Sequence, residues 1–390
     1  MLLTLVSPMP AMAIALTLGS LLMGCNQVDV VGLVAEDTGH VTPVMPNHST
    51  ISTCDQVAQV FDQALCSCGP ATVTAGLATK SSDGMQTAHV KVAGALNTSG
   101  MPGTIEGDLV LASANTSVMS GDDTKVKGDL WVVGELGVDG VLSVEGDAYV
   151  AAPIFGSGSV TIKGDLQSPI ADLVMASTAE VDVMGMSITK SFSVAAPCVC
   201  GAQAPDIAGW VADRSQTQNH DNAQLGFDQD SLSALSDKAE VSLPAGTLWI
   251  SEVNAPGDLI LVLSGDTTLL VQGDMQVGGI LSANGGPDGD LAIFVAGSVA
   301  LGGKPQLADA PNASHGRMYV GGPMSVDAKS SAKGQKQWVG SLYAPQLSLQ
   351  LTGDTEVNGA LHVGELTVLG KMHSTYDSAV ADIVEDCDAH

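Results

Sequence analysis

Apolar and polar residues alternate along most of this chain, and a Gly-Asp dipeptide interrupts the alternation again and again. In residues 125–150, KVKGDLWVVGELGVDGVLSVEGDAYV, Gly128-Asp129 precedes Leu-Trp-Val and Gly146-Asp147 precedes Ala-Tyr-Val. Residues two apart point to the same side of a strand, so each motif predicts a corner followed by a short strand with one buried face. Glycine adopts backbone angles that other residues resist, and aspartate can accept a hydrogen bond from the backbone two residues further on.

The Gly-Asp motif recurs at regular intervals. It starts at Gly107, Gly128, Gly146, Gly164, Gly257, Gly265, Gly273, Gly289 and Gly353. The first intervals, of 21, 18 and 18 residues, match three short strands with three tight corners, whereas the later intervals of 8, 8 and 16 indicate a period of sixteen. A fixed period is typical of stacked arrays, in which neighbouring turns complete one another's core. The sequence therefore predicts an all-β protein with two β-solenoid regions; a β-sandwich, the alternative, gives no reason for the same dipeptide to recur.

Composition agrees with a narrow aliphatic core. Hydrophobic residues make up 45% of the 390 residues but aromatic residues only 3%, and a solenoid interior is filled by aliphatic ladders rather than by large rings. The formal net charge is −28, from 42 acidic and 14 basic residues. This charge excludes nucleic acid as a partner, because binding a phosphate backbone requires a basic face. Acidic lipid headgroups are an equally poor partner.

The first 24 residues predict export. The stretch MLLTLVSPMPAMAIALTLGSLLMGC carries no charge and is apolar up to Cys25. It resembles a bacterial lipoprotein signal peptide, which implies that residues 1–24 are removed and that Cys25 becomes the lipidated amino terminus. An ordinary secretory signal or a membrane span is the alternative, but Pro8 and Pro10 interrupt the stretch. Because Asn26 rather than Asp follows, the resemblance implies an outer-membrane lipoprotein, on the periplasmic or cell-surface face.

Six further cysteines remain: Cys54, Cys66, Cys68, Cys198, Cys200 and Cys387. An even number in an exported chain predicts disulfides, with the connectivity left open. CSCGP (66–70) and CVCGA (198–202) lie at the two ends of the first predicted solenoid. Two Cys-x-Cys pairs could alternatively hold a soft metal through four sulfurs, although zinc ligands are usually separated by two or more residues.

The same signals predict the domain organisation. Residues 51–70 have Val57, Val60, Phe61, Ala64 and Leu65 at helical spacing, which predicts an amphipathic helix that caps the first solenoid. The predicted segments are a signal peptide at 1–24, a flexible tether at 25–50, a Cys-containing helical cap at 51–70, a first β-solenoid at 71–196, a Cys-x-Cys and helical linker at 197–240, a second β-solenoid at 241–377 and an acidic tail at 378–390.

The C-terminal half carries a more specific resemblance. GDTTLLVQGDMQVGG (265–279), GSLYAPQLSLQLTGDTEVNGALHVGELTVLG (340–370) and MHSTYDSAV (372–380), preceded by DIAGWVADRSQTQNHDNAQLGFD (206–228), resemble a bacterial domain of unknown function. That domain is β-helix-like and occurs in envelope lipoproteins and in PilX-like pilus-associated proteins. The resemblance implies no catalytic residues, and Ala245 stands where relatives often have a cysteine. The N-terminal repeats resemble polymer-forming bactofilins through their Gly-Asp corners.

Candidate sites for chemistry are few. Asp122-Asp123, near Lys125 and Lys127, is an adjacent acidic pair that a polysaccharide-degrading enzyme could use, but a pair at a glycine-containing turn is typical of a solvated corner. NGGPDGD (284–290) offers calcium the oxygens of Asn284, Asp288 and Asp290, yet calcium needs six to eight oxygens.

Three aromatic residues are predicted to face outward, where they could stack on sugar rings: Trp131, Tyr149 and Trp338.

These observations favour a non-enzymatic cell-envelope lipoprotein that presents a rigid β-solenoid surface and has a structural, adhesive or pilus-related role. No catalytic residue and no cofactor is expected. The expected partners are the membrane, through the lipid, and an envelope or pilus protein or polysaccharide, with self-association as a further expectation. The alternatives are a polysaccharide lyase or hydrolase on a β-helix and a self-assembling bactofilin-like scaffold.

Overall fold

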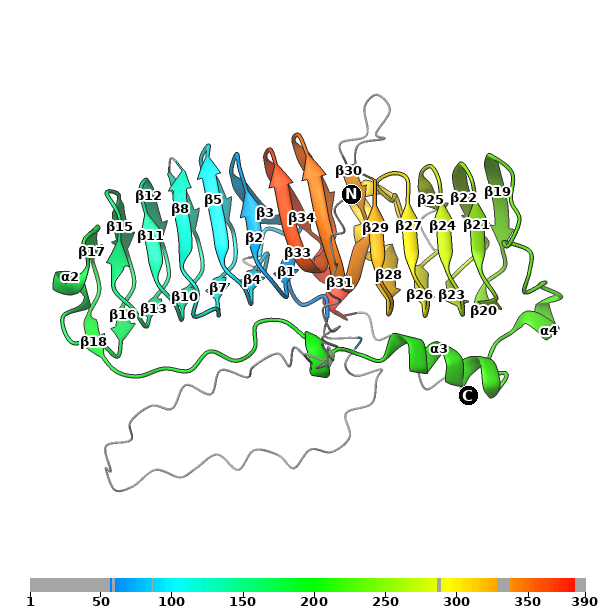
Figure 1. The fold of residues 1–390 in the computed structure, drawn as a ribbon, viewed down its shortest axis with the longest axis horizontal. Helices are drawn as coiled ribbons and strands as arrows, with labels where there is room; N and C mark the ends of the chain where they lie inside the picture. The colour runs from blue at the N-terminus through cyan, green and yellow to red at the C-terminus, as the bar shows by residue number, and fades with distance from the viewer. Residues whose placement is uncertain are drawn as a thin grey trace, which may run out of the picture. The chain divides into compact units, whose positions relative to one another are not determined.

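The chain folds into a β-solenoid of about 14 turns, here called coils. The computed structural model describes residues 57, 60–85, 87–121, 123–285, 289–327 and 337–382, all within one compact unit. The predicted fold class is therefore confirmed. Figure 1 shows the short strands stacked side by side along the solenoid, with few helices. None of the helices in the described ranges is long and apolar enough to span a membrane.

Each coil contributes strands to three faces, which we number in chain order from the first coil. Face 1 contains β1 (Leu65–Ser67), β4 (Val90–Val92), β7 (Leu109–Leu111), β10 (Leu130–Val132), β13 (Ala148–Val150), β16 (Leu166–Ser168), β18 (Ser187–Thr189), β20 (Gly246–Ile250), β23 (Thr267–Val271), β26 (Leu291–Val295) and β28 (Gly316–Val320). Face 2 contains β2 (Ala71–Val73), β5 (Leu96–Gly100), β8 (Ser117–Gly121), β11 (Leu136–Val138), β14 (Ile154–Phe155), β21 (Val253–Ala255), β24 (Met275–Val277), β27 (Val299–Leu301) and β29 (Met324–Val326).

Face 3 contains β3 (Leu77–Ser81), β6 (Gly103–Ile105), β9 (Thr124–Val126), β12 (Val141–Val144), β15 (Ser159–Ile162), β17 (Glu180–Val183), β19 (Lys238–Leu243), β22 (Asp258–Leu263), β25 (Leu281–Asn284), β30 (Gln337–Val339), β32 (Thr355–Asn358) and β34 (Met372–Tyr376). Two long strands, β31 (Ser341–Thr352) and β33 (Leu361–Leu369), bend from face 1 into face 2. The helical segments are α2 (Leu173–Ala176), η1 (Gly201–Gln203), α3 (Ile207–Gln216), α4 (Asn222–Leu225), η3 (Ala310–His315) and η5 (Ser378–Asp382).

The inward residues of each strand form aliphatic ladders. One ladder consists of fully buried residues in register across four coils: Leu109, Leu130, Ala148 and Leu166. Their offsets are the 21- and 18-residue spacings that the sequence predicts. In the C-terminal half the predicted period of sixteen is wrong. Leu248 pairs with Leu269 and Leu269 with Ile293, so successive coils there are offset by 21 and 24 residues. The eight-residue spacing corresponds to one side of a coil, because the motifs at 257, 265 and 273 precede β22, β23 and β24 in turn.

The two predicted solenoids are not separate bodies but one stack. The first coil pairs in parallel with the last coil, β1 and β2 with β33 and β3 with β34. From this contact, which we call the joint, the N-terminal coils stack away in one direction as far as β18. The chain then passes along the solenoid to its opposite end, and the C-terminal coils run from β19 back to the joint (Figure 1). The chain therefore begins and ends its solenoid in the middle of the stack.

Two local predictions also need correction. The predicted helical cap at 51–70 contains strand β1, which is the first strand of the solenoid. Its apolar residues are buried as expected, but Leu65 lies in the core of the stack rather than on a covering helix. Trp338 was predicted to face outward and is instead fully buried among the core side chains.

The two ends of the stack differ. At the C-terminal half's outer end, residues just before the first coil cover the edge of β20: Asn222 exchanges side-chain hydrogen bonds with the backbone of Trp249, and Asp221 accepts one from Thr247. Leu232 is fully buried there. At the other end, β17 and β18 each pair on one side only. The edge of β20 is thus covered at one end, whereas β17 and β18 at the other end, like β19, which pairs only with β22, have an open strand edge.

The Gly-Asp corners are held by a ladder of aspartates rather than by turns within each coil. The Asp129 side chain accepts a hydrogen bond at 2.8 Å from the backbone N–H of Asp147 one coil away, and Asp108 and Asp147 accept in the same way from Asp129 and Asp165. The predicted bond to the backbone two residues further along is therefore wrong for these corners. The predicted reason for glycine is also wrong, because Gly146 does not adopt a left-handed backbone.

Glycine is required at these corners by close stacking. A Cβ added at Gly146 would collide with Asp129 Oδ1 and lie 2.7 Å from the carbonyl oxygen of Gly128. The backbone N–H of Gly146 donates to that same carbonyl at 3.1 Å. A side chain at Gly146 would therefore push adjacent coils apart.

This geometry predicts that Gly146→Val lowers the melting temperature far more than Asp129→Asn. Burial, with help from the charges of Asp108 and Asp147, raises the pKa of Asp129, so a neutral amide whose oxygen still accepts the same bond is tolerated. Thermal melts of the two variants test this, with Asp123→Asn, an exposed aspartate, as the control. Equal losses for Gly146→Val and Asp129→Asn would contradict the stacking explanation.

Candidate functional site

One ladder of outward side chains runs along face 1 through both halves of the stack. In spatial order it consists of Trp249, Leu270, Phe294, Tyr319, Tyr343, His362, Cys66, Lys91, Val110, Trp131, Tyr149, Gln167 and Ile188. The ladder contains six of the thirteen Phe, Trp and Tyr residues of the chain, and it crosses the joint between His362 and Cys66. Outward apolar residues in such numbers need a cover.

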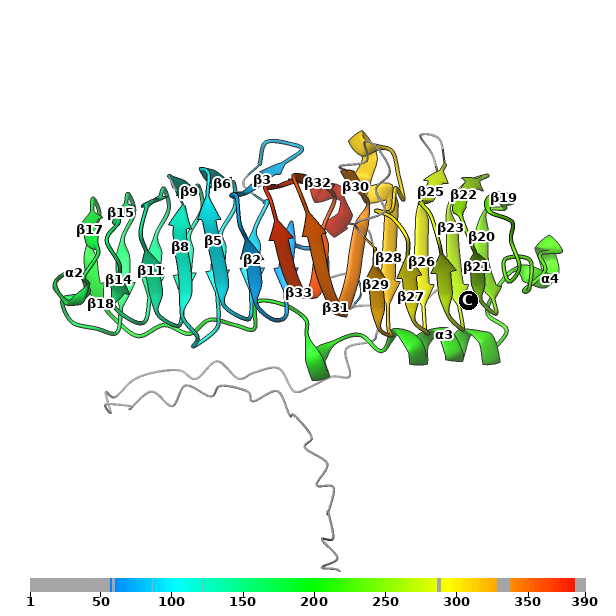
Figure 2. The same ribbon diagram turned by 45° about the horizontal axis from the view of Figure 1, so that its top comes forward.

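The segment between β18 and α3, residues 190–206, supplies part of that cover, and we call it the strap. Phe192 of the strap lies edge-on to the stacked rings of Trp131 and Tyr149, with centroids 6.0 and 5.9 Å away. Beyond the strap, α3 packs Trp210 against Phe294, with the ring centroids 4.5 Å apart. Figure 2 shows α3 lying along the strands of the C-terminal half. The N-terminus of α3 is capped by Asp206, which accepts a hydrogen bond from the backbone N–H of Gly209.

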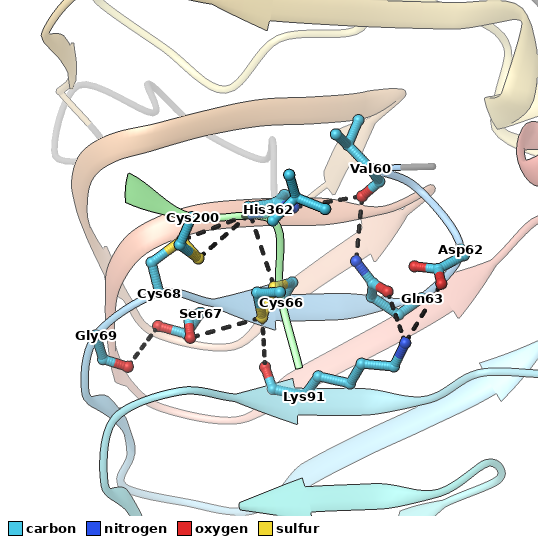
Figure 3. The surroundings of a disulfide bond; sticks show 12 residues. Val60, Asp62, Gln63, Cys66, Ser67, Cys68, Gly69, Lys91, Cys200 and His362 are labelled. Carbon is cyan, nitrogen blue, oxygen red and sulfur yellow. Dashed lines mark hydrogen bonds and ion pairs between the residues drawn. A yellow bond between two sulfur atoms is a disulfide. The ribbon is translucent and has the colours of Figure 1, made fainter. Parts of the chain in front are cut away.

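Two disulfides fasten the strap to the first coil at the joint. Cys66 and Cys68 of β1 and its following corner pair with Cys198 and Cys200 of the strap, with Cα–Cα distances of 6.0 and 5.8 Å (Figure 3). The Cys-x-Cys spacing explains the parallel pairing: residues two apart on each segment face the same way, so both pairs meet when the segments run side by side. The structure thus gives the connectivity that the sequence left open for these four residues.

His362 of β33 lies beside these cysteines. We call the four cysteines and His362 the sulfur cluster. Its Nε2 lies 3.7 Å from Sγ of Cys66, 3.5 Å from Sγ of Cys68 and 3.8 Å from Sγ of Cys200 (Figure 3). Its Nδ1 lies 3.3 Å from the carbonyl oxygen of Val60. The ring is fully buried, and this desolvation lowers the pKa of His362 to about 4, so the imidazole is neutral.

A polar rim closes one side of the sulfur cluster. Lys91 lies 3.1 Å from Oε1 of Gln63 and 3.3 Å from the carboxylate of Asp62, and Gln63 in turn donates to the carbonyl of Val60. Tyr376, near the C-terminal end of the solenoid, donates a hydrogen bond to the carbonyl of Phe61 at 2.7 Å. The sulfur cluster therefore lies where the first coil, the last coil and the strap meet.

The sulfur cluster offers two kinds of chemistry. As disulfides, the sulfurs tie the strap to the first coil. As thiolates, sulfurs are ligands for soft and borderline metals, and ligand atoms of Cys66, Cys200 and His362 all lie within 4.8 Å of one another.

Five of the predicted site residues lie outside the described residues: Cys25, Cys54, Cys387, Asp122 and Asp288.

Asn284 and Asp290, the other two residues of the predicted calcium site, have different surroundings. Asn284 is exposed at the end of β25. The carboxylate of Asp290 lies 3.1 Å from His315 Nδ1 and 3.5 Å from Arg317 Nη1, so an imidazole and a guanidinium face it.

Glu106, which follows strand β6 of face 3, does not have the electrostatics of a glycosidase acid. Glu106 lines an open groove of about 510 Å³ with Glu356 and His373, but its Oε1 lies 2.6 Å from Lys127 Nζ. The hydrogen bond from Lys127 lowers the pKa of Glu106, whereas a general acid at neutral pH needs a raised one. The predicted sugar-stacking rings, Trp131 and Tyr149, face outward but are stacked on each other at 3.6 Å beneath the strap.

Sequence reasoning missed His362. The alternation in Leu-His-Val (361–363) marks it as outward on its strand, since Leu361 and Val363 are buried inward. Nothing in the sequence shows that this outward position adjoins Cys66, because that neighbourhood exists only once the last coil stacks on the first.

Residues 195–383 match the family model described as a domain of unknown function, DUF7305. This region contains Cys198, Cys200 and His362 of the sulfur cluster. It extends from within the strap to the end of the last coil. No curated protein and no solved structure shows significant similarity to the chain.

The two parallel disulfides predict strongly non-additive effects of mutation. Each closes a loop with a sequence separation of 132, and once one is formed the second closes almost no additional loop. Cys198→Ser or Cys200→Ser alone should therefore cost little, whereas the double variant should lose about 2–5 kcal/mol. Denaturant unfolding measures this, after non-reducing peptide mapping has verified both pairs. A double variant that loses only the sum of two small single effects would contradict the parallel fastening.

Proposed function

We propose that this chain is a lipid-anchored structural protein of the bacterial cell envelope, attached through Cys25 and displaying a rigid solenoid for contact with other envelope components. The main support for this proposal is the position of the joint. Because the first and last coils are neighbours, the N-terminal segment leaves the solenoid at its middle, and two arms extend from that point. An anchor at Cys25 would therefore attach the solenoid at its middle rather than at one of its ends.

The solenoid's construction supports a mechanical or display role. With a coil spacing of about 4.8 Å, 14 coils span roughly 65 Å. Continuous ladders of aliphatic residues fill the interior from end to end, and the joint is fixed by backbone pairing as well as by the strap. Such a body keeps its outer faces at fixed spacing, which suits repeated contacts with a polysaccharide or a pilus protein.

Lipidation predicts that Cys25→Ala releases the protein from the membrane. The thioether to the lipid forms at this cysteine, and without it the anchor is lost. Detergent phase partitioning of the full chain measures the result, with Cys54→Ala as a control because it removes a nearby cysteine outside the signal. A Cys25→Ala protein that still partitions with detergent would contradict the proposed anchor.

The open strand edge supports a second candidate function, self-association. Around β17 and β18, Met175, Met184 and Met186 are 85%, 66% and 64% exposed, whereas at the opposite end the edge of β20 is covered. A second copy presents the same cross-section and the same unpaired strand edges at its own β17 and β18 end. If two copies meet through this end, each uses the same surface, so the contact closes as a dimer.

This candidate predicts a monomer–dimer equilibrium that depends on the open end. Met184→Lys with Met186→Lys should shift the Cys25→Ala protein to monomer in sedimentation velocity, because the added charges would have to be buried. Met85→Lys with Met101→Lys is the matched control, since these exposed methionines lie elsewhere. A protein that is monomeric at every concentration, or that responds equally to both pairs, would overturn the self-association candidate.

A further inference from the structure

The sulfur cluster contains the imidazole of His362, which the two disulfides do not need in order to form. A neutral imidazole carries one N–H and one bare lone pair. The polar partners of His362 are the carbonyls of Val60 and Val199 and three sulfurs, none of which donates a hydrogen bond to the ring while the cysteines are paired. Whichever nitrogen carries the proton, the other lone pair of this buried ring is left facing acceptors.

The distances around Nε2 match a metal's coordination shell. Zinc binds thiolate at about 2.3 Å and imidazole nitrogen at about 2.0–2.1 Å, so a tetrahedral site separates sulfur and nitrogen ligands by about 3.6 Å. The observed separations of Nε2 from the sulfurs of Cys66, Cys68 and Cys200 are 3.7, 3.5 and 3.8 Å. Cys198 is different: its Sγ lies against the carbonyls of Ser67 and Lys91.

The second coordination shell is also present. Metal-bound histidines usually donate their other N–H to a carbonyl or carboxylate, which fixes the tautomer and the ring orientation. The Nδ1 of His362 faces the carbonyl of Val60 at 3.3 Å, and Gln63 holds that carbonyl with a hydrogen bond of its own. With the proton on Nδ1, the Nε2 lone pair points at the three sulfurs.

We propose that the reduced sulfur cluster is a zinc site, with Cys66, Cys68, Cys200 and His362 as the four ligands and Cys198 as a non-ligand thiol. The inference concerns the joint and does not depend on the proposed anchor or on self-association. The disulfides fasten the strap to the first coil, and zinc would fasten these two segments and the last coil as well. Only the zinc form engages the last coil directly, through His362.

The two forms interconvert by a balanced reaction. Reduction of both disulfides takes four electrons and four protons from two equivalents of a dithiol. Binding of Zn²⁺ then releases the three protons of the ligating thiols, while the thiol of Cys198 keeps its own. Two equivalents of an oxidised dithiol reverse the reaction: they accept the four electrons, the thiol of Cys198 loses its proton, and Zn²⁺ is released as the disulfides form.

The test uses the full chain, reduced and purified without oxygen, with Zn²⁺ as the added ion and Co²⁺ as a spectroscopic probe of tetrahedral thiolate coordination. The reduced protein should bind one equivalent that the oxidised protein does not bind at this site. Cys198→Ser should keep that equivalent. His362→Leu should weaken binding by more than the roughly 10–100-fold that changes around a ligand cause.

Controls separate this site from loss of folding and from other thiols. His373→Leu changes an exposed histidine of β34 and should bind like the unaltered chain. Circular dichroism of each variant verifies the fold, and Cys68→Ser provides a second ligand variant if His362→Leu does not fold. Absence of zinc from the reduced protein would overturn the proposal, as would unchanged binding in His362→Leu or equal loss in Cys198→Ser and Cys68→Ser.

Discussion

The parallel pairing of the last coil with the first is the interaction on which the rest of this structure depends. It joins Leu361 to Leu65 on face 1 and Met372 to Leu77 on face 3, across about 300 residues of chain. Without it, each half would end at the joint in an open strand edge over an exposed aliphatic core. With it, the core is continuous, and both ends of the solenoid chain are fixed at the middle of the stack.

The joint also explains why the fastening is placed where it is. A segment that must pass from β18 to the opposite end of the stack has to cross the joint, and the strap does so over the outward ladder of face 1. The disulfides at Cys66 and Cys68 hold it at that crossing. They therefore hold the strap at the joint, the place where neighbouring coils of the described residues are distant in sequence.

The proposed roles follow from this arrangement at different levels. A central attachment follows from the position of the joint, and self-association follows from the open strand edge at β17 and β18. The zinc inference follows from three segments that bring one imidazole and several sulfurs together. Each depends on contacts between residues that no local motif connects, so the functional features of this chain are products of coil stacking rather than of any one coil.

The sequence by itself determined the fold class, because a period-2 apolar pattern with recurring corners can bury its inner face only by stacking. It also marked the cysteines and, in the N-terminal half, the length of a coil. It could not determine that the halves form one stack, why Gly146 must be glycine, or that His362 adjoins Cys66. Those facts depend on which coil lies against which. Backbone hydrogen bonds form between any two coils that fit, whatever their separation in the sequence. Only the tertiary structure supplies that neighbour, and with it the candidate site.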